Sequence, residues 1–358
     1  MKYISGIHAL NLNCELETTG DWHQSALDWT NIQMKESNGS VFGNWGIEQN
    51  KAIPNSSRRY AVANHIRAIL DMLEDSDFSN ARGFRHDYIC NEMYNETVFQ
   101  LVSKLRESEN WHAIAKFMER EYMMQWVRWM EKNHMYTYTD NDESVAHVNW
   151  QRHIGIMKQF LAFSSGNGAS EFVLKGGAAL MVRYRSPRTS DNIDLDGTDW
   201  HLDKLVIPFC SSRGYSYRLE KDTNAKVRYT ISYSNDEYSK PLVIEASYTR
   251  KAILKTDLCN RITNALGFPV YNIDRLMNLK LSAYHGRDNV RDLYDIIFMF
   301  IKYRHHLSVE TTARLVDIME SKGLEHIEWL LHTQRDSLID TDELQNSVIK
   351  LWYDLSLM

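Results

Sequence analysis

The fold of this chain is decided by the stretch LKGGAALMVRYRSPRTSDNIDLD, residues 174–196. Residues 171–175 form a short apolar run at its start, which predicts a buried strand. A glycine pair follows, then a helical segment over 178–184, and residues 192–196 predict a second strand bounded by Gly197. The pattern therefore predicts a strand, a glycine turn, a helix and a second strand in close succession.

The turn and the second strand carry residues suited to phosphate chemistry. Gly176 and Gly177 let backbone N–H groups approach a triphosphate at the N-terminus of the following helix. Asp194 and Asp196 lie two apart on a strand, so both carboxylates point to one face. Carboxylates placed in this way form a site for Mg²⁺, or Mn²⁺ in its place, and such ions align a hydroxyl with the phosphoryl group that it attacks.

Basic and hydroxyl side chains surround this turn. We expect Lys175 and Arg188 to neutralise phosphate charge and Ser190 to hydrogen-bond a phosphate oxygen, with Arg183 and Arg185 as further phosphate contacts. A glycine pair or an Asp-x-Asp sequence alone is weak evidence, because exposed carboxylates at strand ends are common. Their combination across strand, turn, helix and strand is a much stronger signal.

At this point the sequence resembles a known family. Residues 172–196, 279–284 and 287–295 resemble the AbiEii-type nucleotidyltransferase toxins, which are related to the MenT toxins within the polymerase-beta-like superfamily. The shared features are a lysine before two glycines, an arginine and a serine before the aspartate pair, and a later Arg-Asp-x-Tyr-Asp motif. The chain departs from the family at Asn289, where a lysine is frequent. The resemblance covers roughly residues 147–305 and the helices that follow.

The resemblance implies further site residues in the later motif. It makes Lys280 and Asp292 active-site residues, and Lys280 on its helix would meet phosphate as a point charge. Asp292 and Asp295 are three apart on a helix and therefore share a face. The alternative is that these aspartates form a structural ion-pair network with Arg287 and Arg291 between helices.

A third metal-binding carboxylate is expected from a later strand. Glu245 is the best candidate, because an acid within the apolar strand Leu242–Ala246 is costly to bury without a cation. Glu220 and Asp222 on an earlier strand are its rivals.

The chain divides into two parts at the polar, acidic segment 136–144. Residues 1–143 should form a separate N-terminal domain, mainly helical, with helices near 59–75, 92–107 and 111–133. Residues 144–358 should form a nucleotidyltransferase domain of the α+β class. We expect a small mixed sheet with flanking helices over about 147–265, then a helical bundle over about 270–358 with helices at 273–285, 289–304, 307–322, 323–331 and 340–355.

The N-terminal domain has no catalytic constellation, but its charge is distinctive. Residues 1–143 contain 14 basic and 21 acidic residues, against 27 and 26 in the remainder. An acidic domain of this kind fits either an antitoxin-like regulator that inhibits the enzyme in cis or a substrate-recognition module. His23 is more readily explained as a packed histidine than as a ligand.

Composition excludes several classes of protein. The longest apolar runs are too short to span a membrane, and the N-terminus lacks the apolar stretch of a secretory signal. The four cysteines are far apart and suggest neither a metal site nor a disulfide framework. A cytoplasmic protein without a membrane partner is therefore expected.

Together these features predict an enzyme that moves a nucleotide from a nucleoside triphosphate to an acceptor, either RNA such as a transfer-RNA 3′ end or a protein. The resemblance implies a bacterial toxin of a toxin–antitoxin or phage-defence system that acts by abortive infection, with a cognate antitoxin as partner. The rival hypotheses are a nucleotide-binding regulator without turnover and an interaction protein.

Overall fold

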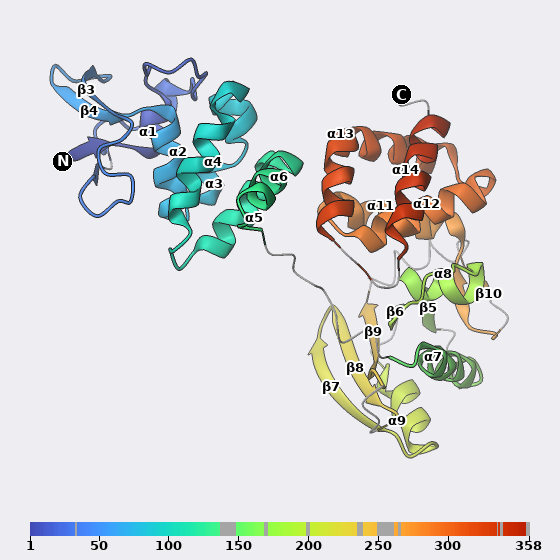
Figure 1. Cartoon of the computed structure of the whole chain (residues 1–358). Coiled ribbons are helices and arrows are strands. Elements are labelled where there is room, and N and C mark those ends of the chain that lie inside the picture. Colours follow the sequence, from blue (N-terminus) through green and yellow to red (C-terminus); the bar gives the residue numbers. More distant parts are fainter. Residues whose placement is uncertain are drawn as a thin grey trace. The chain divides into compact units, whose positions relative to one another are not determined.

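The computed structural model shows a chain of two compact units, Met1–Thr137 and Tyr138–Met358 (Figure 1). The structure describes residues 1–32, 34–136, 148–167, 171–197, 201–234, 239–248, 261–263, 266–334, 336 and 339–355. The predicted boundary between residues 143 and 144 lies outside these described residues. Within them, none of the helices has the length and apolar character needed to cross a membrane.

The first unit combines a small sheet with helices. The sheet has the strand order β2-β1-β4-β3, formed by β1 (Lys2–Ile4), β2 (Met34–Glu36), β3 (Ile47–Ala52) and β4 (Arg59–Ala63). The α-helices are α1 (Gly6–Leu10), α2 (His65–Glu74), α3 (Phe78–Ala81), α4 (Asn95–Val102), α5 (Trp111–Tyr122) and α6 (Met124–Lys132). Short 3-10 or π-helical turns are η1 (Gln24–Ala26), η2 (Arg85–Ile89), η3 (Glu92–Tyr94) and η4 (Ser103–Leu105).

Three predicted helices of this unit differ from the structure. The helix expected over 59–75 is wrong at its start, because Arg59–Ala63 forms β4 and the side chain of Asn64 then caps α2 by accepting the N–H of Arg67 at 2.8 Å. The helix expected over 92–107 is divided into η3, α4 and η4. The one expected over 111–133 breaks at Met123, whose φ of 46° and ψ of −127° are not helical.

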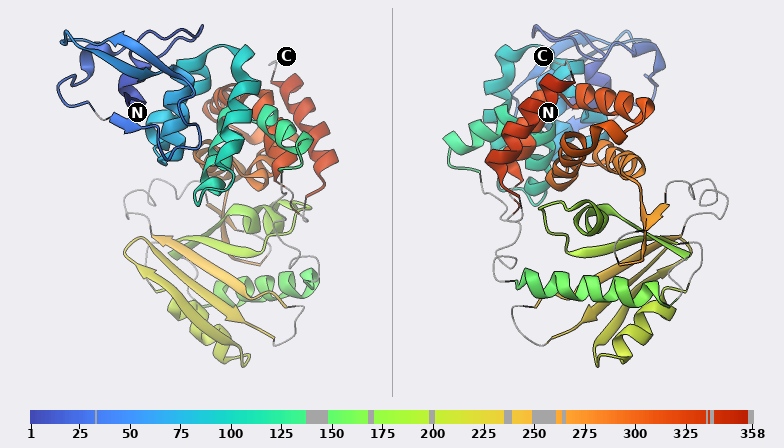
Figure 2. Two further views of the ribbon diagram at one scale, coloured as in Figure 1. Left: turned by 60° about the vertical axis from the view of Figure 1, so that its left-hand side comes forward. Right: turned by 90° about the vertical axis from the view of Figure 1, so that its right-hand side faces the viewer.

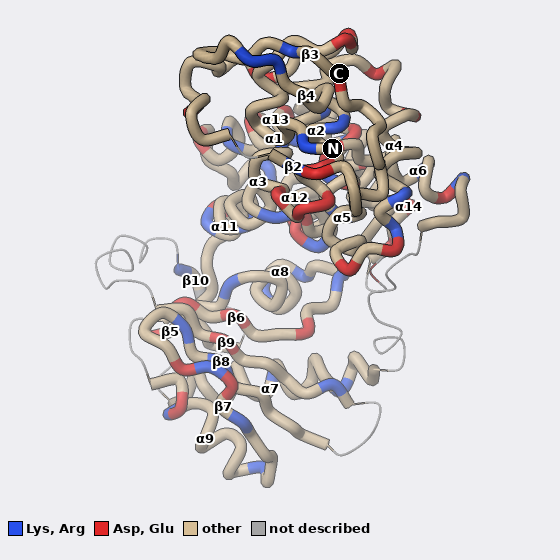
Figure 3. Tube along the Cα trace, turned by 90° about the vertical axis from the view of Figure 1, so that its left-hand side faces the viewer, with Lys and Arg blue, Asp and Glu red and all other residues tan. Residues whose placement is uncertain are grey.

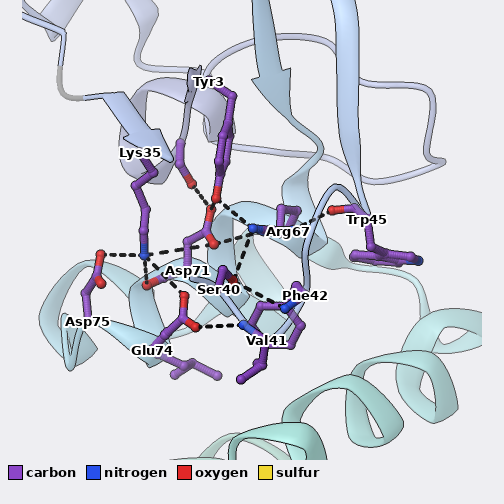
Figure 4. Close-up of polar contacts among 12 residues, drawn as sticks. Tyr3, Lys35, Ser40, Val41, Phe42, Trp45, Arg67, Asp71, Glu74 and Asp75 are labelled. Carbon is purple, nitrogen blue, oxygen red and sulfur yellow. Dashed lines mark hydrogen bonds and ion pairs between the residues drawn. The ribbon is translucent and has the colours of Figure 1, made fainter. Parts of the chain in front are cut away.

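A buried arginine joins the sheet of this unit to α2 (Figure 4). Arg67 is fully buried and its guanidinium donates to the Oδ1 of Asp71, the carbonyls of Gly43 and Trp45, the Oη of Tyr3 and the Oγ of Ser40, at 2.8 to 3.3 Å. Asp71 also accepts from Tyr3 and Ser5. All five N–H donors of the guanidinium are thereby satisfied, which is the condition for burying this charge without a large penalty.

The second unit is built on a mixed seven-stranded sheet. Its strand order is β10-β11-β5-β6-β9-β8-β7. The strands are β5 (Phe172–Lys175), β6 (Asn192–Gly197), β7 (Ser216–Thr223), β8 (Lys226–Ser232), β9 (Leu242–Tyr248), β10 (Arg261–Thr263) and β11 (Pro269–Tyr271). β6 is antiparallel to β5 and parallel to β9, while β7, β8 and β9 form an antiparallel meander. The five strands β5 to β9 agree with the sequence prediction, whereas the short strands β10 and β11 were not predicted.

Helices cover both faces of this sheet (Figure 2). α7 (Trp150–Ser165) and α9 (Asp203–Ser211) lie on one face and contact each other through Phe160 and Phe209, whose ring centroids are 5.2 Å apart. α8 (Gly176–Tyr184) lies on the opposite face and contacts β5 and β6. The α+β class that the sequence predicted is confirmed.

A helical bundle follows the sheet. It contains α11 (Ile273–Gly286), α12 (Val290–Tyr303), a 3-10 turn η8 (Arg304–His306), α13 (Val309–Thr333) and α14 (Thr341–Asp354). The predicted helices 307–322 and 323–331 agree with the structure, because α13 consists of two helical segments divided at Gly323, where φ is 71° and ψ is 164° and the backbone is not helical. The hydroxyl of Tyr184 donates to the carbonyl of Tyr271 at 3.0 Å, and Tyr303 of α12 donates to the carbonyl of Tyr184 at 2.8 Å. These bonds tie the bundle to α8 and the sheet.

Candidate active site

The glycine turn is shaped by the two side chains that lie against it. α8 begins at Gly176, where φ is +67° and an added Cβ would lie 3.0 Å from Oδ2 of Asp194. A Cβ on Gly177 would lie 2.7 Å from Nη2 of Arg188 and 3.1 Å from Oγ of Ser190. The first glycine is needed for its left-handed backbone, and both allow close approach of polar side chains to the N-terminus of α8.

One row of charged residues crosses five neighbouring strands. In the register of the sheet, Lys175 on β5 lies opposite Asp194 on β6, and Asp194 lies opposite Glu245 on β9. Glu245 lies opposite Arg228 on β8, and Arg228 lies opposite Lys221 on β7. Cross-strand partners project from the same face of a sheet, so the five side chains share a face. The predicted pair Asp194 and Glu245 is therefore brought together by the register.

Asp196 lies on the same face, two residues further along β6. Its Oδ1 is 2.5 Å from Nζ of Lys175, and its Oδ2 accepts the hydroxyl of Tyr271 at 3.0 Å. Tyr271 belongs to β11 and is 1% exposed. Both oxygens of the Asp196 carboxylate are thus oriented by buried or half-buried donors.

The other two carboxylates have contrasting environments. Glu245 is held by Nζ of Lys226 at 2.5 Å and by Nη2 of Arg228 at 2.5 Å. Asp194 makes no hydrogen bond or ion pair with any residue that the structure describes, and its Oδ2 faces the backbone of Gly176. Burial raises the pKa of Asp194, Lys175 opposes this rise, and Glu245 adds to it. Burial also acts to raise the pKa of Glu245, but hydrogen bonds from Lys226 and Arg228 outweigh it and the pKa is lowered.

These residues fit a cation site of oxygen ligands, although no three His, Cys, Asp or Glu side chains of the described segments already gather as a metal cluster. The face carries three carboxylates, and basic side chains neutralise two of them. The third, Asp194, is a half-buried acid without a described donor beside the N-terminus of α8, which has no side-chain cap. A divalent cation with oxygen ligands is a species that would lower the cost of ionising such an acid.

A buried ion cluster lies beside the turn. Asp295 on α12 is fully buried and binds Arg188 through both carboxylate oxygens at 2.9 to 3.1 Å. Lys280 on α11 lies 2.6 Å from Asp295 and 2.9 Å from Asp292, and Arg287 donates to Asp292 at 2.7 Å. Burial alone would lower the pKa of Lys280, but the two aspartates reverse this and raise it. The later motif therefore forms an ion-pair network between helices, but it includes Lys280 and Arg188 and leaves out Arg291, which the expected network contained. Lys280 and Arg287 lie close enough to Asp194 to interact with its charge.

One arginine of the later motif lies outside the buried ion cluster. Arg291 forms ion pairs with Asp336 and Asp191 instead.

Arg188, expected to contact phosphate, is 6% exposed, and its guanidinium donates to Asp295 and to the carbonyl of Thr189. Its position against Gly177 makes it a support for the turn. Ser190 donates to the carbonyl of Asn192 at 3.2 Å and also lies against Gly177.

The rival carboxylates lie further away. Glu220 and Asp222 belong to β7, which is separated from β6 by β8 and β9. Glu220 pairs with Arg218 at 2.6 Å on the exposed edge strand. Glu245 is thus the candidate that the sheet places next to Asp194.

Sequence reasoning missed three residues of this site. Lys226 and Arg228 alternate with buried apolar residues on β8, and this period of two was a signal that could have placed both on one face. Tyr271 gave no such signal, because its strand has only three residues and lies 75 positions from Asp196.

Comparisons with known proteins identify a family for most of the second unit. The model of the family described as "Nucleotidyl transferase AbiEii toxin, Type IV TA system" matches residues 159–348. A search of curated proteins found no match. Similar solved structures include JHP933 from Helicobacter pylori, with 22% identity, a TM-score of 0.47 and coverage of 58% of this chain and 93% of that one. A second H. pylori structure, provisionally assigned as a nucleotidyltransferase, has 23% identity, a TM-score of 0.47 and coverage of 57% and 96%.

Proposed function

Because the chain belongs to the family of AbiEii nucleotidyl transferase toxins of type IV toxin–antitoxin systems, we propose that it transfers a nucleotide from a nucleoside triphosphate to an acceptor in the presence of Mg²⁺ or Mn²⁺. The observation that carries the proposal is the common face of Asp194, Asp196 and Glu245 beside the N-terminus of α8. The preferred acceptor is RNA, such as a transfer-RNA 3′ end, and a protein hydroxyl is the second choice.

The carboxylates would hold the cation. Asp194 and Asp196 would be its ligands, and Glu245 would be a third if Lys226 and Arg228 moved away from it. A bound divalent cation would supply charge stabilisation and alignment of the phosphoryl group. Lys175 contacts Asp196 in the absence of ligands, and a bound triphosphate offers its ammonium group a second anion to neutralise.

The glycine turn and α11 would hold the triphosphate. The first N–H groups of α8 have no intrahelical partner and point out of the helix N-terminus, where phosphate oxygens accept them. Lys280 adds a positive charge that Asp292 and Asp295 keep in its protonated form. Arg188 acts indirectly, since its bidentate bond to Asp295 fixes the guanidinium under Gly177.

The proposed transfer forms one phosphorus–oxygen bond and breaks another. The acceptor hydroxyl oxygen bonds to the α-phosphorus, the bond from that phosphorus to the bridging oxygen breaks, and pyrophosphate leaves with the electron pair. The hydroxyl proton passes to solvent or to a carboxylate of the site. A cellular toxin of this kind blocks growth by modifying an essential RNA or protein, and a cognate antitoxin would prevent this.

The test is transfer of label by the purified full chain. We expect α-³²P-labelled nucleoside triphosphate to label total RNA or protein in the presence of Mg²⁺, and Asp194→Asn to slow labelling by about 10³-fold. Asp222→Asn, which removes an exposed charge on β7, is the matched control and should retain activity. Tight nucleotide binding with no label on any acceptor would instead support a regulator without turnover.

A further inference from the structure

The hairpin of β7 and β8 has one strongly basic face. Arg218 and Lys221 on β7 and Lys226 and Arg228 on β8 project to the same side, and we call these four residues the basic hairpin face. The strand register fixes this assignment, because Lys221 lies opposite Arg228 and Arg228 lies opposite Glu245 of the candidate active site. Figure 3 shows basic positions along β7 and β8.

A β-bulge creates this arrangement. Regular alternation would put Arg218 and Lys221, three residues apart, on opposite faces of β7. The register shifts between Leu219 and Lys221, so that Lys221 lies on the same face as Arg218. Bulges of this kind re-aim a side chain, and this one adds a cation to the row that contains Asp194 and Glu245.

The opposite face of β8 is apolar and buried. Val227, Tyr229 and Ile231 are buried there, and Tyr229 lies near Asp203 of α9. Tyr217 and Leu219 on β7 continue this apolar face, and both are exposed. The cations are therefore concentrated on the one face of the hairpin that is continuous with the candidate active site.

The basic hairpin face keeps an excess of positive charge. Lys226 and Arg228 share Glu245, and Arg218, whose side chain is 78% exposed, pairs with Glu220. Lys221 is exposed and has no ion-pair partner among the residues that the structure describes. Four cations therefore face two carboxylates on a surface made largely of exposed side chains.

The spacing of the cations suits the phosphodiester backbone of a nucleic acid. Strands in a sheet are about 4.8 Å apart, so Lys221 lies roughly 14 Å from Asp194, three strands away. Cations on one strand that are two residues apart are separated by roughly 7 Å. A nucleic acid whose terminal hydroxyl lies at Asp194 would thus place its next few phosphates over β8 and β7.

We propose that the basic hairpin face docks the phosphodiester backbone of an RNA acceptor and directs its terminal hydroxyl toward Asp194. This proposal rests on the proposed function and identifies the acceptor as RNA, since a protein acceptor provides no regular row of phosphates. The competing occupant is the acidic N-terminal unit of the same chain, whose negative charge also complements this face.

The test measures RNA binding without chemistry. Full-length protein carrying Asp194→Asn is titrated into fluorescein-labelled total transfer RNA at several KCl concentrations, and binding is followed by anisotropy. We expect Arg218→Glu/Lys221→Glu to weaken binding at least about tenfold and to reduce the slope of log K against log[KCl] by about 1.4 to 1.8, because each lost phosphate contact removes about 0.7 to 0.9.

The chain offers a matched control on the opposite side of the sheet. Lys158 on α7 and Lys204 on α9 are exposed, so Lys158→Glu/Lys204→Glu changes the net charge by the same amount away from the basic hairpin face. This control should bind RNA as tightly as its parent. Equal weakening in both double variants, or none in either, would overturn the proposal.

A crosslinking experiment distinguishes RNA from the N-terminal unit as the occupant of the basic hairpin face. A photocrosslinker at position 221 should trap transfer RNA, and trapping a peptide of the N-terminal unit while RNA is present would overturn the proposal.

A kinetic experiment distinguishes failure of the docking proposal from failure of the proposed function. With Asp194 restored, Arg218→Glu/Lys221→Glu should raise KM for RNA and leave the affinity for nucleoside triphosphate unchanged. If the enzyme transfers nucleotides but KM for RNA is unaltered, the proposed function stands and the docking proposal fails. If no transfer occurs, the binding experiment still decides the docking proposal.

Discussion

Asp194 and Glu245 are neighbours in the sheet, yet their surroundings shift their pKa values in opposite directions. Asp194 lies in a half-buried place without a described donor, whereas Glu245 has two cations within 2.5 Å. The folded protein therefore disfavours the charge on Asp194 and favours the charge on Glu245. Such a split is common where carboxylates have separate chemical tasks.

Replacing Asp194 by Asn should separate stability from activity. The native pKa of Asp194 is raised above its unfolded value, so native wild-type protein loses stability as pH rises through this native pKa. Asn carries no charge at any pH. In EDTA at neutral pH we expect a higher free energy of unfolding for Asp194→Asn than for wild type, a gap that closes below the ordinary Asp pKa. Nucleotide transfer should fall by about 10³-fold, since several kcal/mol of cation-dependent stabilisation are lost.

Urea titrations between pH 3.5 and 7.5 would measure this difference. Glu245→Gln should behave in the opposite way, because its lowered pKa contributes stability that is present at neutral pH and is lost as pH falls through its native pKa. A destabilised Asp194→Asn at neutral pH would show that its carboxylate is stabilised as a charge and would contradict our view of the site.

Tyr271 should tune cation binding through Asp196. Its hydroxyl donates to Oδ2 of Asp196, and loss of such a partner typically weakens metal affinity by about 10- to 100-fold. We expect Tyr271→Phe to raise the dissociation constant for Mn²⁺, measured by electron paramagnetic resonance. Tyr284→Phe is the control, because the hydroxyl of this buried tyrosine has no hydrogen-bond partner in the described part of the chain. Equal effects of both variants would show a general loss of packing.

At the scale of elements, the turn between β5 and α8 depends on both glycines. A methyl group on Gly177 would meet the guanidinium of Arg188, which its bidentate bond to Asp295 prevents from moving freely. We expect Gly177→Ala to lower the free energy of unfolding by about 1 to 3 kcal/mol, the usual cost of overpacking. Gly155→Ala is the matched control within α7, since nothing lies within 4 Å of its added Cβ.

The control should stabilise the protein by about 0.5 to 1 kcal/mol, because alanine favours a helix interior over glycine. Thermal or urea unfolding of the two variants measures both changes. A neutral Gly177→Ala would mean that Arg188 is free to leave the turn, and would reopen a direct phosphate-binding role for this side chain.

The elements of the second unit were predictable to the extent that their signals were local. Strands β5 and β6 and helix α8 follow from residues 174–196, because the glycine turn and the period of two are visible in the sequence. β10 and β11 were missed because three-residue strands have no periodicity to detect. In the first unit, β4 was taken for helix because its alanines favour helices, whereas pairing with β1 and β3 decides its conformation.

The site itself was predictable only in part for a related reason. Lys175, Asp194 and Asp196 are close in sequence, and the acid in an apolar strand marked Glu245. The partnership of Arg188 with Asp295 joins positions 107 residues apart, so their bond depends on how α12 packs against the turn. Spacing along the chain does not predict such a contact. Arg188 was therefore expected to bind phosphate, because its partner Asp295 could not be identified from the sequence.

At the scale of the whole molecule, each unit has a hydrophobic interior of its own. The first has a continuous cluster that runs from Tyr3 to Met130. The second has buried apolar residues in both its sheet and its bundle, among them Leu195, Ile244, Leu293 and Leu330, so we expect residues 145–358 to fold when expressed alone. If the acidic N-terminal unit is a regulator, this fragment should slow cell growth more than the full chain does, and Asp194→Asn in the fragment should remove the effect. Equal toxicity of fragment and full chain would favour substrate recognition as the role of the first unit.

The tyrosine bonds that join α8, β11 and α12 have a consequence for the way the second unit opens. The carbonyl of Tyr184 accepts from Tyr303 and its hydroxyl donates to the carbonyl of Tyr271, so the two bonds link α12 to α8 and α8 to β11. Sheet and bundle should then behave as one cooperative unit in native-state hydrogen exchange. The slowest amides of β6 and α12 should exchange with equal opening free energies and equal sensitivity to urea, whereas earlier exchange of α12 would show that the bundle opens by itself.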